Sequence, residues 1–421
     1  MAKAMDSRPA PNLAPHKAIP AENRAPIGFA EFVSLVAALM ALTALGIDAM
    51  LPALPAIGTA LGVASENQRQ FVISAFLLGF GLAQLVHGPL ADRFGRRPVL
   101  LIALSGYVVA NLIAAFASSF TLLLVARFAS GLAIAASRVV TVALVRDCYS
   151  GRAMARVMSL AFMVFMAAPV LAPSFGQVIL LFGNWQMIFV MIAVVSAGVL
   201  IWFALRMPET LAVEARQPLS LARLASGWGR ALTDRSSIGY TLAATALLGA
   251  LYGFINSVQQ IVAALTGGDD LLVPVFIGVA GMMALANLLN SRIVMRLGTR
   301  RISHSALTGL IVLAGVHLAL AQAGWETIWT FAVLQALTMA CFGLATANFS
   351  AMAMENMGAI AGTASSVQGF TTVTIGTVVG AMIGLGFDGT TVPLFRGFFI
   401  AGLIALVIVA IVERGRLFQP S

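Results

Sequence analysis

Three ionisable residues lie inside long apolar stretches of this 421-residue chain, where burying a charged side chain costs free energy. Asp48 falls in an apolar stretch near 29–51, and Arg127 in another near 120–145. A charged side chain in the middle of a bilayer costs ~3 kcal/mol on insertion scales. A carboxyl group that gains and loses a proton beside a cavity is what proton coupling requires. Asp48 is therefore the first candidate for a proton-coupling residue.

Arg127 lies seven residues into its stretch, about 10 Å from the outer end at the helical rise, which is close to the expected depth of Asp48. If the two stretches face each other, Arg127 can neutralise Asp48 and favour its charged form. The pair then either couples transport to protons or is a fixed ion pair that only holds two helices together. We favour the coupling role.

Arg138 lies eleven residues further along the same stretch, about 16 Å deeper. No second carboxylate is evident at that depth. Arg138 either attracts anionic groups and influences Asp48 through a shared cavity, or supports packing at the inner helix end.

Uncharged polar residues in the second half of the chain are further candidates for lining a cavity or contacting a substrate. Hydrogen bonds between helices are the commoner use of such residues, and Asn287 and Asn290 are expected in that role. The candidates for substrate contact, besides Arg138, are Tyr252, Asn256, Gln259, Gln335 and Asn348.

The composition indicates the elements that must position these residues. The chain is 60% hydrophobic and only 10% charged, which excludes a soluble globular protein and a disordered one. A membrane-crossing helix needs ~20 apolar residues. The two cysteines do not suggest a disulfide framework or a metal site. The sequence predicts twelve spans, near 29–51, 68–90, 98–117, 120–145, 155–180, 186–206, 236–262, 272–294, 302–323, 327–352, 361–386 and 394–412.

These spans divide the chain into two six-helix bundles, at 27–206 and 236–412. We expect a flexible cytoplasmic tail at 1–26, a cytoplasmic linker at 207–235 and a short cytoplasmic tail at 413–421. In the linker, Leu221, Leu224, Trp228 and Leu232 share one helical face. The linker therefore either lies along the inner membrane surface or is a solvated connection.

The basic residues predict the orientation. With a cytoplasmic N-terminus, 21 of the 25 Lys and Arg residues lie inside, and only Arg69 and Arg396 lie outside. Positively charged loops stay in the cytoplasm, so both termini are expected there. The same rule explains the formal charge of +9 without a nucleic-acid partner.

An internal repeat supports the division into halves. Residues 93–97 read RFGRR after the second span, and residues 296–300 read RLGTR after the eighth. The shift is 203 residues, and it also carries the first span onto the seventh and the fourth onto the tenth. Parallel duplication of a six-helix unit is typical of one large class of transporters.

Several segments resemble the Bcr/CflA drug-resistance group of the major facilitator superfamily. Residues 88–98 (GPLADRFGRRP) resemble the signature loop of the superfamily. The group's other motifs are similar to residues 48–55 (DAMLPALP), 127–131 (RFASG), 137–140 (SRVV), 146–147 (RD), 169–176 (PVLAPSFG) and 361–366 (AGTASS).

The resemblance implies an all-α fold of twelve helices, a cavity lined by spans one, four, seven and ten, and proton-driven export. It also implies a cytoplasmic latch, in which Asp92 lies near the amino end of span eleven. The latch residues are Gly88, Asp92, Arg93, Gly95, Arg96, Arg97 and Asp147. In the fifth span, Pro169 and Pro173 each remove a helix hydrogen bond, and with Gly176 they predict a hinge or a close-packing site.

We therefore predict a monomeric antiporter in a bacterial inner membrane that exchanges protons for small amphipathic compounds. Its partners would be protons, substrate and lipid, with no cofactor and no metal. No phosphate-binding loop indicates coupling to ATP. The alternative is an exporter or facilitator of a specific metabolite such as an amino acid, peptide or siderophore. A polytopic sensor or enzyme is a remote alternative, because no catalytic cluster is present at either face.

Overall fold

The computed structural model describes residues 25–418, apart from the side chains of residues 155, 162, 164–170, 221, 223 and 359. In that part of the chain all regular structure is helical. Most of the predicted tail at 1–26 lies outside the described residues. The first half contains α1 (Phe29–Asp48), α2 (Leu54–Ala60), α3 (Phe71–Phe94), α4 (Arg96–Ala115), α5 (Phe120–Cys148), α6 (Gly151–Phe182) and α7 (Trp185–Arg206).

The second half follows a linker that contains α8 (Leu221–Thr233). Its helices are α9 (Arg235–Thr266), α10 (Leu272–Leu297), α11 (Thr299–Gln322), α12 (Ile328–Met354), α13 (Ala361–Leu385) and α14 (Val392–Val412). Eleven helical segments among the described residues are long and apolar enough to cross a membrane. The remaining long helix, α6, has 32 residues and reaches about 48 Å at the helical rise. The twelve predicted spans therefore match the helices closely.

The first span is longer than predicted and is interrupted. Pro52 and Pro55 lack an amide hydrogen and cannot continue a helix, so α1 ends at Asp48. A 3₁₀ turn (Leu51–Ala53) and α2 follow, each with a proline in its first turn. The break places Asp48 in the last turn of α1.

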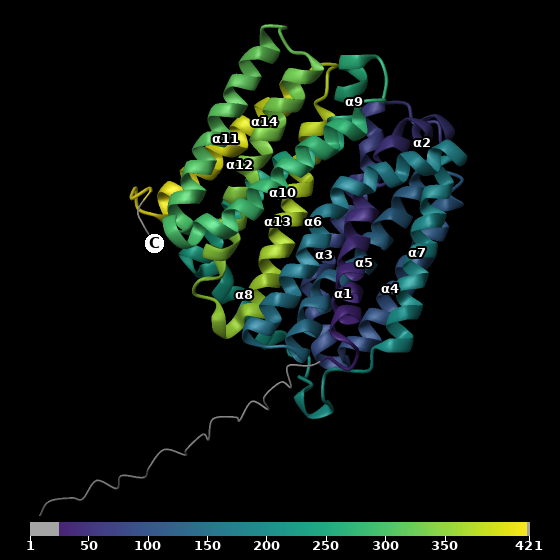
Figure 1. Cartoon of the computed structure of the whole chain (residues 1–421), viewed down its shortest axis with the longest axis vertical. Coiled ribbons are helices and arrows are strands. Elements are labelled where there is room, and N and C mark those ends of the chain that lie inside the picture. The colour runs from purple at the N-terminus through teal and green to yellow at the C-terminus, as the bar shows by residue number, and fades with distance from the viewer. Residues whose placement is uncertain (1–24, 419–421) are drawn as a thin grey trace, which may run out of the picture.

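The two halves lie side by side and meet along two pairs of helices, α3 with α13 and α6 with α10 (Figure 1). We call the end that carries α8 the linker side and the opposite end, where α2 lies, the far side (Figure 1, bottom and top).

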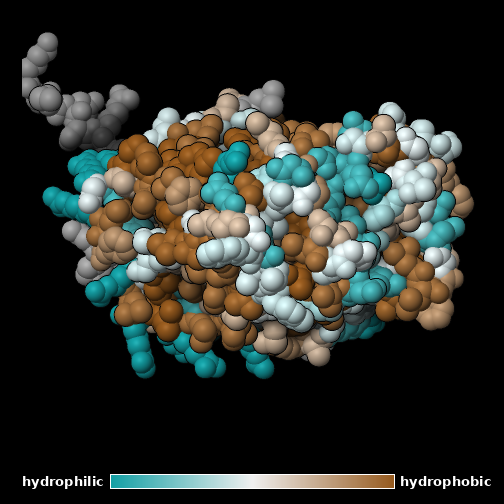
Figure 2. Space-filling view, turned by 90° about the horizontal axis from the view of Figure 1, so that it is seen from above, coloured by the Kyte–Doolittle hydropathy of each residue, from teal (hydrophilic) through white to brown (hydrophobic). Residues whose placement is uncertain are grey.

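The outer surface is apolar over much of its area. Ile102 on α4, Leu205 on α7 and Val407 on α14 are 74%, 78% and 59% exposed. Figure 2 shows hydrophobic residues covering large parts of the molecule when seen from above. Soluble monomers do not expose apolar patches of this extent, so these side chains are expected to face lipid.

The predicted repeat has the same backbone geometry in both halves. Gly95, between α3 and α4, has φ 106° and ψ 159°, and Gly298, between α10 and α11, has φ 79° and ψ 154°. Both values of φ lie in the region that favours glycine. The two loops are therefore equivalent in structure as well as in sequence.

The linker folds against the protein. Helix α8 contacts α13, and Trp228 packs against a small apolar cluster that includes Ala231, Met357 and Val367. The side chains of Leu221 and Arg223 lie outside the described part of the chain. The apolar face of α8 is therefore partly covered by protein, and its contact with the membrane surface stays a prediction.

Candidate transport site

Asp48 lies at the far-side end of α1 and is 4% exposed. Its Oδ1 atom is fully buried and has no hydrogen-bond partner among the described residues. The close approach of α6 contributes to this burial: a Cβ atom on Gly176 would collide with the backbone carbonyl of Ala49. The glycine of the antiporter-like motif thus packs beside the candidate carboxylate. Pro173 is buried nearby on α6, whereas the side chain of Pro169 lies outside the described residues.

Arg127 on α5 is completely buried and faces α1 and α3. Its Nη2 donates to the carbonyl oxygen of Gly46 at 2.7 Å, and its Nε donates to that of Val72 at 3.0 Å. The guanidinium carbon lies 4.4 Å from the ring centroid of Phe76. Arg127 therefore binds the backbone two residues before Asp48. Among residues 25–418 no ion pair joins it to Asp48: its Nε and Nη2 bind backbone carbonyls, and its Nη1 has no hydrogen-bond partner there.

Close helix crossings hold Arg127 in position. A Cβ atom on Gly131 of α5 would collide with the carbonyl oxygen of Phe76, and one on Gly79 of α3 would collide with that of Phe128. The two helices thus approach through glycines on both sides, which keeps the guanidinium of Arg127 against α3.

Tyr252 on α9 is buried between the other two candidates. It interacts electrostatically with both Arg138 and Asp48. A Cβ atom on Gly380 of α13 would collide with the Cβ of Tyr252, so α13 fixes the position of this tyrosine. The phenol of Tyr252 thus lies within electrostatic reach of two charged candidates at different depths.

The far side of the interface between the halves is closed by uncharged hydrogen bonds. Asn67, in the connection between α2 and α3, donates from Nδ2 to the carbonyl oxygens of Leu385 and Phe387, at 3.0 and 2.8 Å. Gln260 on α9 donates to Asn67 Oδ1 at 3.0 Å. We call this set of residues, together with the Asn256–Ser74 contact at 3.4 Å, the far-side seal.

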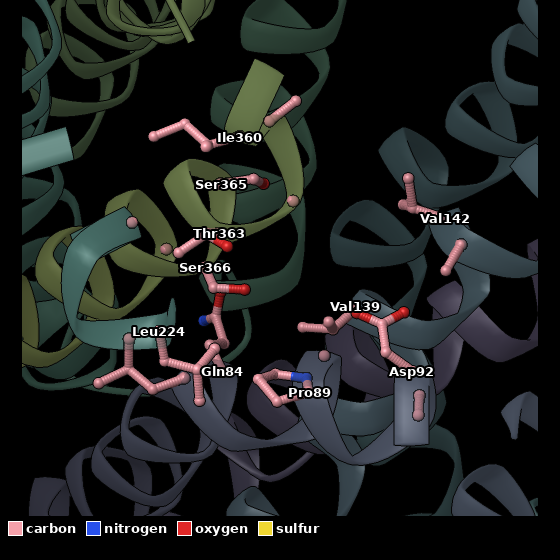
Figure 3. Close-up of a pocket in the computed structure, with 18 of the residues that line it drawn as sticks. Gln84, Pro89, Asp92, Val139, Val142, Leu224, Ile360, Thr363, Ser365 and Ser366 are labelled. Atoms are coloured by element: carbon pink, nitrogen blue, oxygen red, sulfur yellow. The ribbon is translucent and has the colours of Figure 1, made fainter. Parts of the chain in front are cut away.

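The linker side has a cavity of about 950 Å³ between the halves, lined by helices α3, α5, α8 and α13 among others. Figure 3 shows Val139, Val142 and Asp92 on one wall and Ser365 and Thr363 on the opposite wall. Arg138 lines this cavity and is exposed in it.

Of the substrate candidates predicted from sequence, Arg138 is the one that lines this cavity. Asn256 belongs to the far-side seal, and Gln259 donates to Asp269 at 2.9 Å within its own half. Asn348 donates to Asn290 at 3.0 Å and so bridges α12 to α10, which is the bridging role expected of Asn290, and a substrate contact of Asn348 stays a prediction. In this conformation these amides donate to other protein groups.

Gln335 and Tyr252 are also absent from the cavity wall. Gln335 is fully buried on α12, and neither of its amide atoms has a hydrogen-bond partner among the described residues. Its role as a substrate contact stays a prediction.

Three of the predicted latch residues, Asp92, Arg96 and Asp147, form an ion cluster on the linker side. Arg96, which is 3% exposed, donates to Asp92 at 2.6 Å and to Asp147 at 3.0 Å. Arg97 donates to the carbonyl oxygen of Ala204 at 2.9 Å, while Arg93 is exposed. Asp92 lines the cavity together with Gly88 and the first residues of α13. In this conformation the carboxylate of Asp92 is bound by Arg96.

Glu209 completes this cluster and was not identified from the sequence. Its carboxylate accepts hydrogen bonds from the backbone N–H groups of Arg96 and Arg97, at 2.9 and 3.1 Å. These N–H groups begin α4, where a carboxylate is stabilising. Glu209 lies 113 residues from Arg96 along the chain, so no local pattern could have revealed it.

The second half has its own ion cluster at the equivalent loop. Arg300 donates to Glu413 at 2.9 Å and lies 3.5 Å from Glu355, and the hydroxyl of Tyr240 donates to Glu413. Burial alone would raise the pKa of Glu413, but the hydrogen bonds from Tyr240 and Arg300 outweigh it and hold that pKa below its ordinary value. Glu413, predicted to begin a tail, is therefore part of the folded structure.

Known proteins resemble this chain along most of its length. The sequence model of the Major Facilitator Superfamily matches residues 36–381. The bicyclomycin resistance protein homolog of Haemophilus influenzae is 30% identical over 371 residues, which are 86% of this chain and 91% of that protein. Multidrug resistance protein MdtL of Klebsiella pneumoniae is 30% identical over 389 residues, which are 88% and 94% of the two chains.

A solved structure has the same fold. The xylose transporter XylE from E. coli, in a partially occluded inward open conformation, gives a TM-score of 0.71 at 11% identity, covering 92% of this chain and 97% of that one. The family that the sequence motifs indicated is confirmed. This chain belongs to the Major Facilitator Superfamily and is a multi-pass membrane transporter of a small-molecule substrate.

Proposed function

We propose that the protein is a monomeric, proton-coupled exporter of small amphipathic compounds in a bacterial inner membrane. The names of two relatives, a bicyclomycin resistance protein homolog and a multidrug resistance protein, support export of drug-like molecules. The linker side is then cytoplasmic, because it carries the arginine-rich loops around Gly95 and Gly298. No cofactor takes part, and the proton gradient supplies the energy.

The observation that carries this proposal is the environment of Asp48. Its carboxyl group is buried, lacks a hydrogen-bond partner on Oδ1, and lies on the sealed side of the interface. An unpaired buried charge is costly, so this conformation favours the protonated carboxyl group. When the far-side seal opens, water can reach Asp48 and exchange its proton with the outside. A carboxyl group whose hydration changes with conformation is suited to carry a proton across.

Release to the cytoplasm needs a route from Asp48 to the cavity. Tyr252 lies within electrostatic reach of Asp48 and Arg138, and Arg138 is exposed in the cavity. A phenol group both donates and accepts hydrogen bonds, so Tyr252 can take part in a route from the carboxyl group toward Arg138. Arg127 keeps α1 and α5 together through the carbonyl of Gly46, which positions Asp48 without neutralising it.

The proton gradient is sufficient for useful export. One charge moving through 100 mV gains ~2.3 kcal/mol, which corresponds to a concentration ratio of roughly fifty. Binding of substrate in the cavity and protonation of Asp48 would then alternate as the halves rock between the two states.

The experiment begins with efflux-deficient cells that express the protein and are challenged with a panel of antibiotics including bicyclomycin. The compound to which expression gives the greatest resistance is then used with purified protein in proteoliposomes. We expect an imposed pH gradient to drive uphill movement of this compound by the wild type and by Asp270→Asn. Asp270 is an exposed acid in the loop between α9 and α10, which makes it a matched control.

Asp48→Asn is expected to bind the same compound but to lose movement driven by the pH gradient. If Asp48→Asn concentrates the compound as well as the wild type does, the assignment of the coupling residue is wrong. If the wild type equilibrates the compound without responding to the pH gradient, the protein is a facilitator.

A further inference from the structure

The cavity on the linker side is lined by more positive charge than negative charge. Its charged residues are Arg96, Arg138, Arg146, Arg230 and Asp92. The single carboxylate among them, Asp92, is bound by Arg96 at 2.6 Å. Among the described residues, the other three arginines have no acidic partner within ion-pair distance. The cavity wall therefore presents uncompensated cations and no free carboxylate.

Arg138 differs from the other two unpaired arginines in its depth. Arg146 and Arg230 lie near the mouth of the cavity, where arginines are expected from the rule that orients the chain. Arg138 is ten residues before the end of α5, about 15 Å deeper than that end at the helical rise. It is exposed in the cavity, and the neutral phenol of Tyr252 lies within electrostatic reach of it. A guanidinium at this depth without a counter-charge is costly. The orientation of the chain in the membrane does not explain its presence, because the orienting arginines lie near the ends of the helices.

Other residues that line this cavity offer a polar group and apolar surface for a bound compound. Gln84, on the wall of the same cavity, is 3% exposed, and its Nε2 donor has no hydrogen-bond partner among the described residues. Figure 3 shows Gln84 beside Ser366. Apolar side chains of Val139 and Val142 lie on the opposite wall (Figure 3). The cavity thus combines the exposed guanidinium of Arg138 with an apolar wall.

We propose that the transported compounds carry an anionic group, such as a carboxylate, on an apolar body, and that Arg138 binds that group. This inference rests on the proposed export function and specifies its substrate class. The guanidinium supplies charge-assisted hydrogen bonds, and the valines contact the apolar body. The volume of about 950 Å³ accommodates a drug-sized molecule.

The test is binding of three compounds that differ only in their polar group: 4-(1-naphthyl)butanoate, its primary amide and the corresponding amine. Thermal stabilisation of the full-length protein in detergent at pH 7.5 measures their affinities, with no pH gradient involved. We expect the carboxylate to bind at least about tenfold more tightly than the amide, since hydrogen bonds to charged groups contribute about 1.5–3 kcal/mol. The amine is expected to bind most weakly.

Arg138→Gln should remove the preference for the carboxylate, and Arg138→Lys should keep part of it. Arg146→Gln is the matched control, because it removes the same charge from the same helix near the cavity mouth. It should keep the preference. Equal binding of the three compounds, no detectable binding of the carboxylate, or an unchanged preference in Arg138→Gln would each overturn the proposal.

A lipid headgroup could supply the same anionic chemistry, so one arm adds phosphatidylglycerol to the detergent solution. If the site serves free compounds, the carboxylate still binds in an Arg138-dependent way in the presence of this lipid. If phosphatidylglycerol alone stabilises the wild type in an Arg138-dependent way and abolishes carboxylate binding, Arg138 binds a lipid and the proposal is wrong. Because binding is measured without a gradient, these outcomes are independent of whether Asp48 couples transport to protons.

Discussion

The two ends of the interface between the six-helix halves differ in the chemistry that lines them. The far-side seal consists of amide side chains and backbone carbonyls, with Asn67 at its centre. The cavity on the linker side is bordered by arginines and by the Arg96 ion cluster. Neutral hydrogen bonds each contribute only about 0.5–1.5 kcal/mol, so a seal made of them can open at moderate cost. Asp48 and Arg127 belong to neither set and are both buried.

The largest effect is expected from crowding the far side next to Asp48. In Gly176→Val the new side chain would collide with the backbone carbonyl of Ala49 and contact Pro52. Backbone atoms cannot move aside easily, so the loss of stability should be about 3 kcal/mol or more, with loss of transport. Thermal melting in detergent measures the first, and transport assays measure the second. Gly198→Val is the control, because nothing lies within 4 Å of its added Cβ; an equal effect there would show that α6 does not need close contact with α1.

Removing Arg127 should have the next largest effect. Arg127→Met leaves the carbonyl oxygens of Gly46 and Val72 without these donors and removes the contact with Phe76. We expect destabilisation of about 2–4 kcal/mol, measured by thermal melting. Arg146→Met, at an exposed position, should change stability by less than about 0.5 kcal/mol. Similar melting temperatures for the two variants would mean that the backbone contacts of Arg127 contribute little.

A smaller change should loosen the far-side seal alone. Asn67→Ala removes two hydrogen bonds to the end of α13 and one from Gln260. The expected shift toward a far-side-open state is about 1–3 kcal/mol. A Ser74→Cys reporter in a background lacking Cys148 and Cys341 should then react faster with a membrane-impermeant thiol reagent. Gln68→Ala, at an exposed neighbouring position, should leave the rate unchanged. No acceleration in Asn67→Ala would argue against the seal.

The smallest effect concerns the ion cluster of the second half, which lies outside the transport path. Because the pKa of Glu413 is held below its ordinary value of 4.5, its ionised form stabilises the fold above that pH, and this stabilisation is lost as the pH falls through the lowered pKa. Glu413→Gln should therefore melt at a slightly lower temperature than the wild type at pH 7, and the difference should shrink below about pH 4.5. A difference that grows as the pH falls would contradict the assigned sign.

The fold was largely predictable from the sequence because the length of an apolar run directly limits where a helix can cross a bilayer. The break of the first span at Pro52 and its continuation as α2 were only partly predictable, since the prolines end one helix and also begin the next. The equivalence of the Gly95 and Gly298 loops was predictable because a backbone with positive φ favours glycine, and the glycine is visible in the sequence.

The site was less predictable because its contacts join residues far apart in the chain. The sequence placed Asp48 and Arg127 at similar depths, and the structure brings Arg127 to the carbonyl of Gly46 instead of to the carboxylate. Asn256 was a reasonable substrate candidate by its position on α9, but which polar residues face a cavity depends on how the two halves are tilted. Composition and periodicity do not determine that tilt.

Proton-coupled export requires Asp48 to carry the proton, and proton release on substrate binding tests this directly. Purified protein in weakly buffered detergent solution, near the pH at which export is fastest, is mixed with the transported compound, and a pH indicator counts the protons released. The wild type should release close to one proton per bound molecule, and Asp48→Asn should bind the compound and release none. Undiminished proton release by Asp48→Asn would contradict the account.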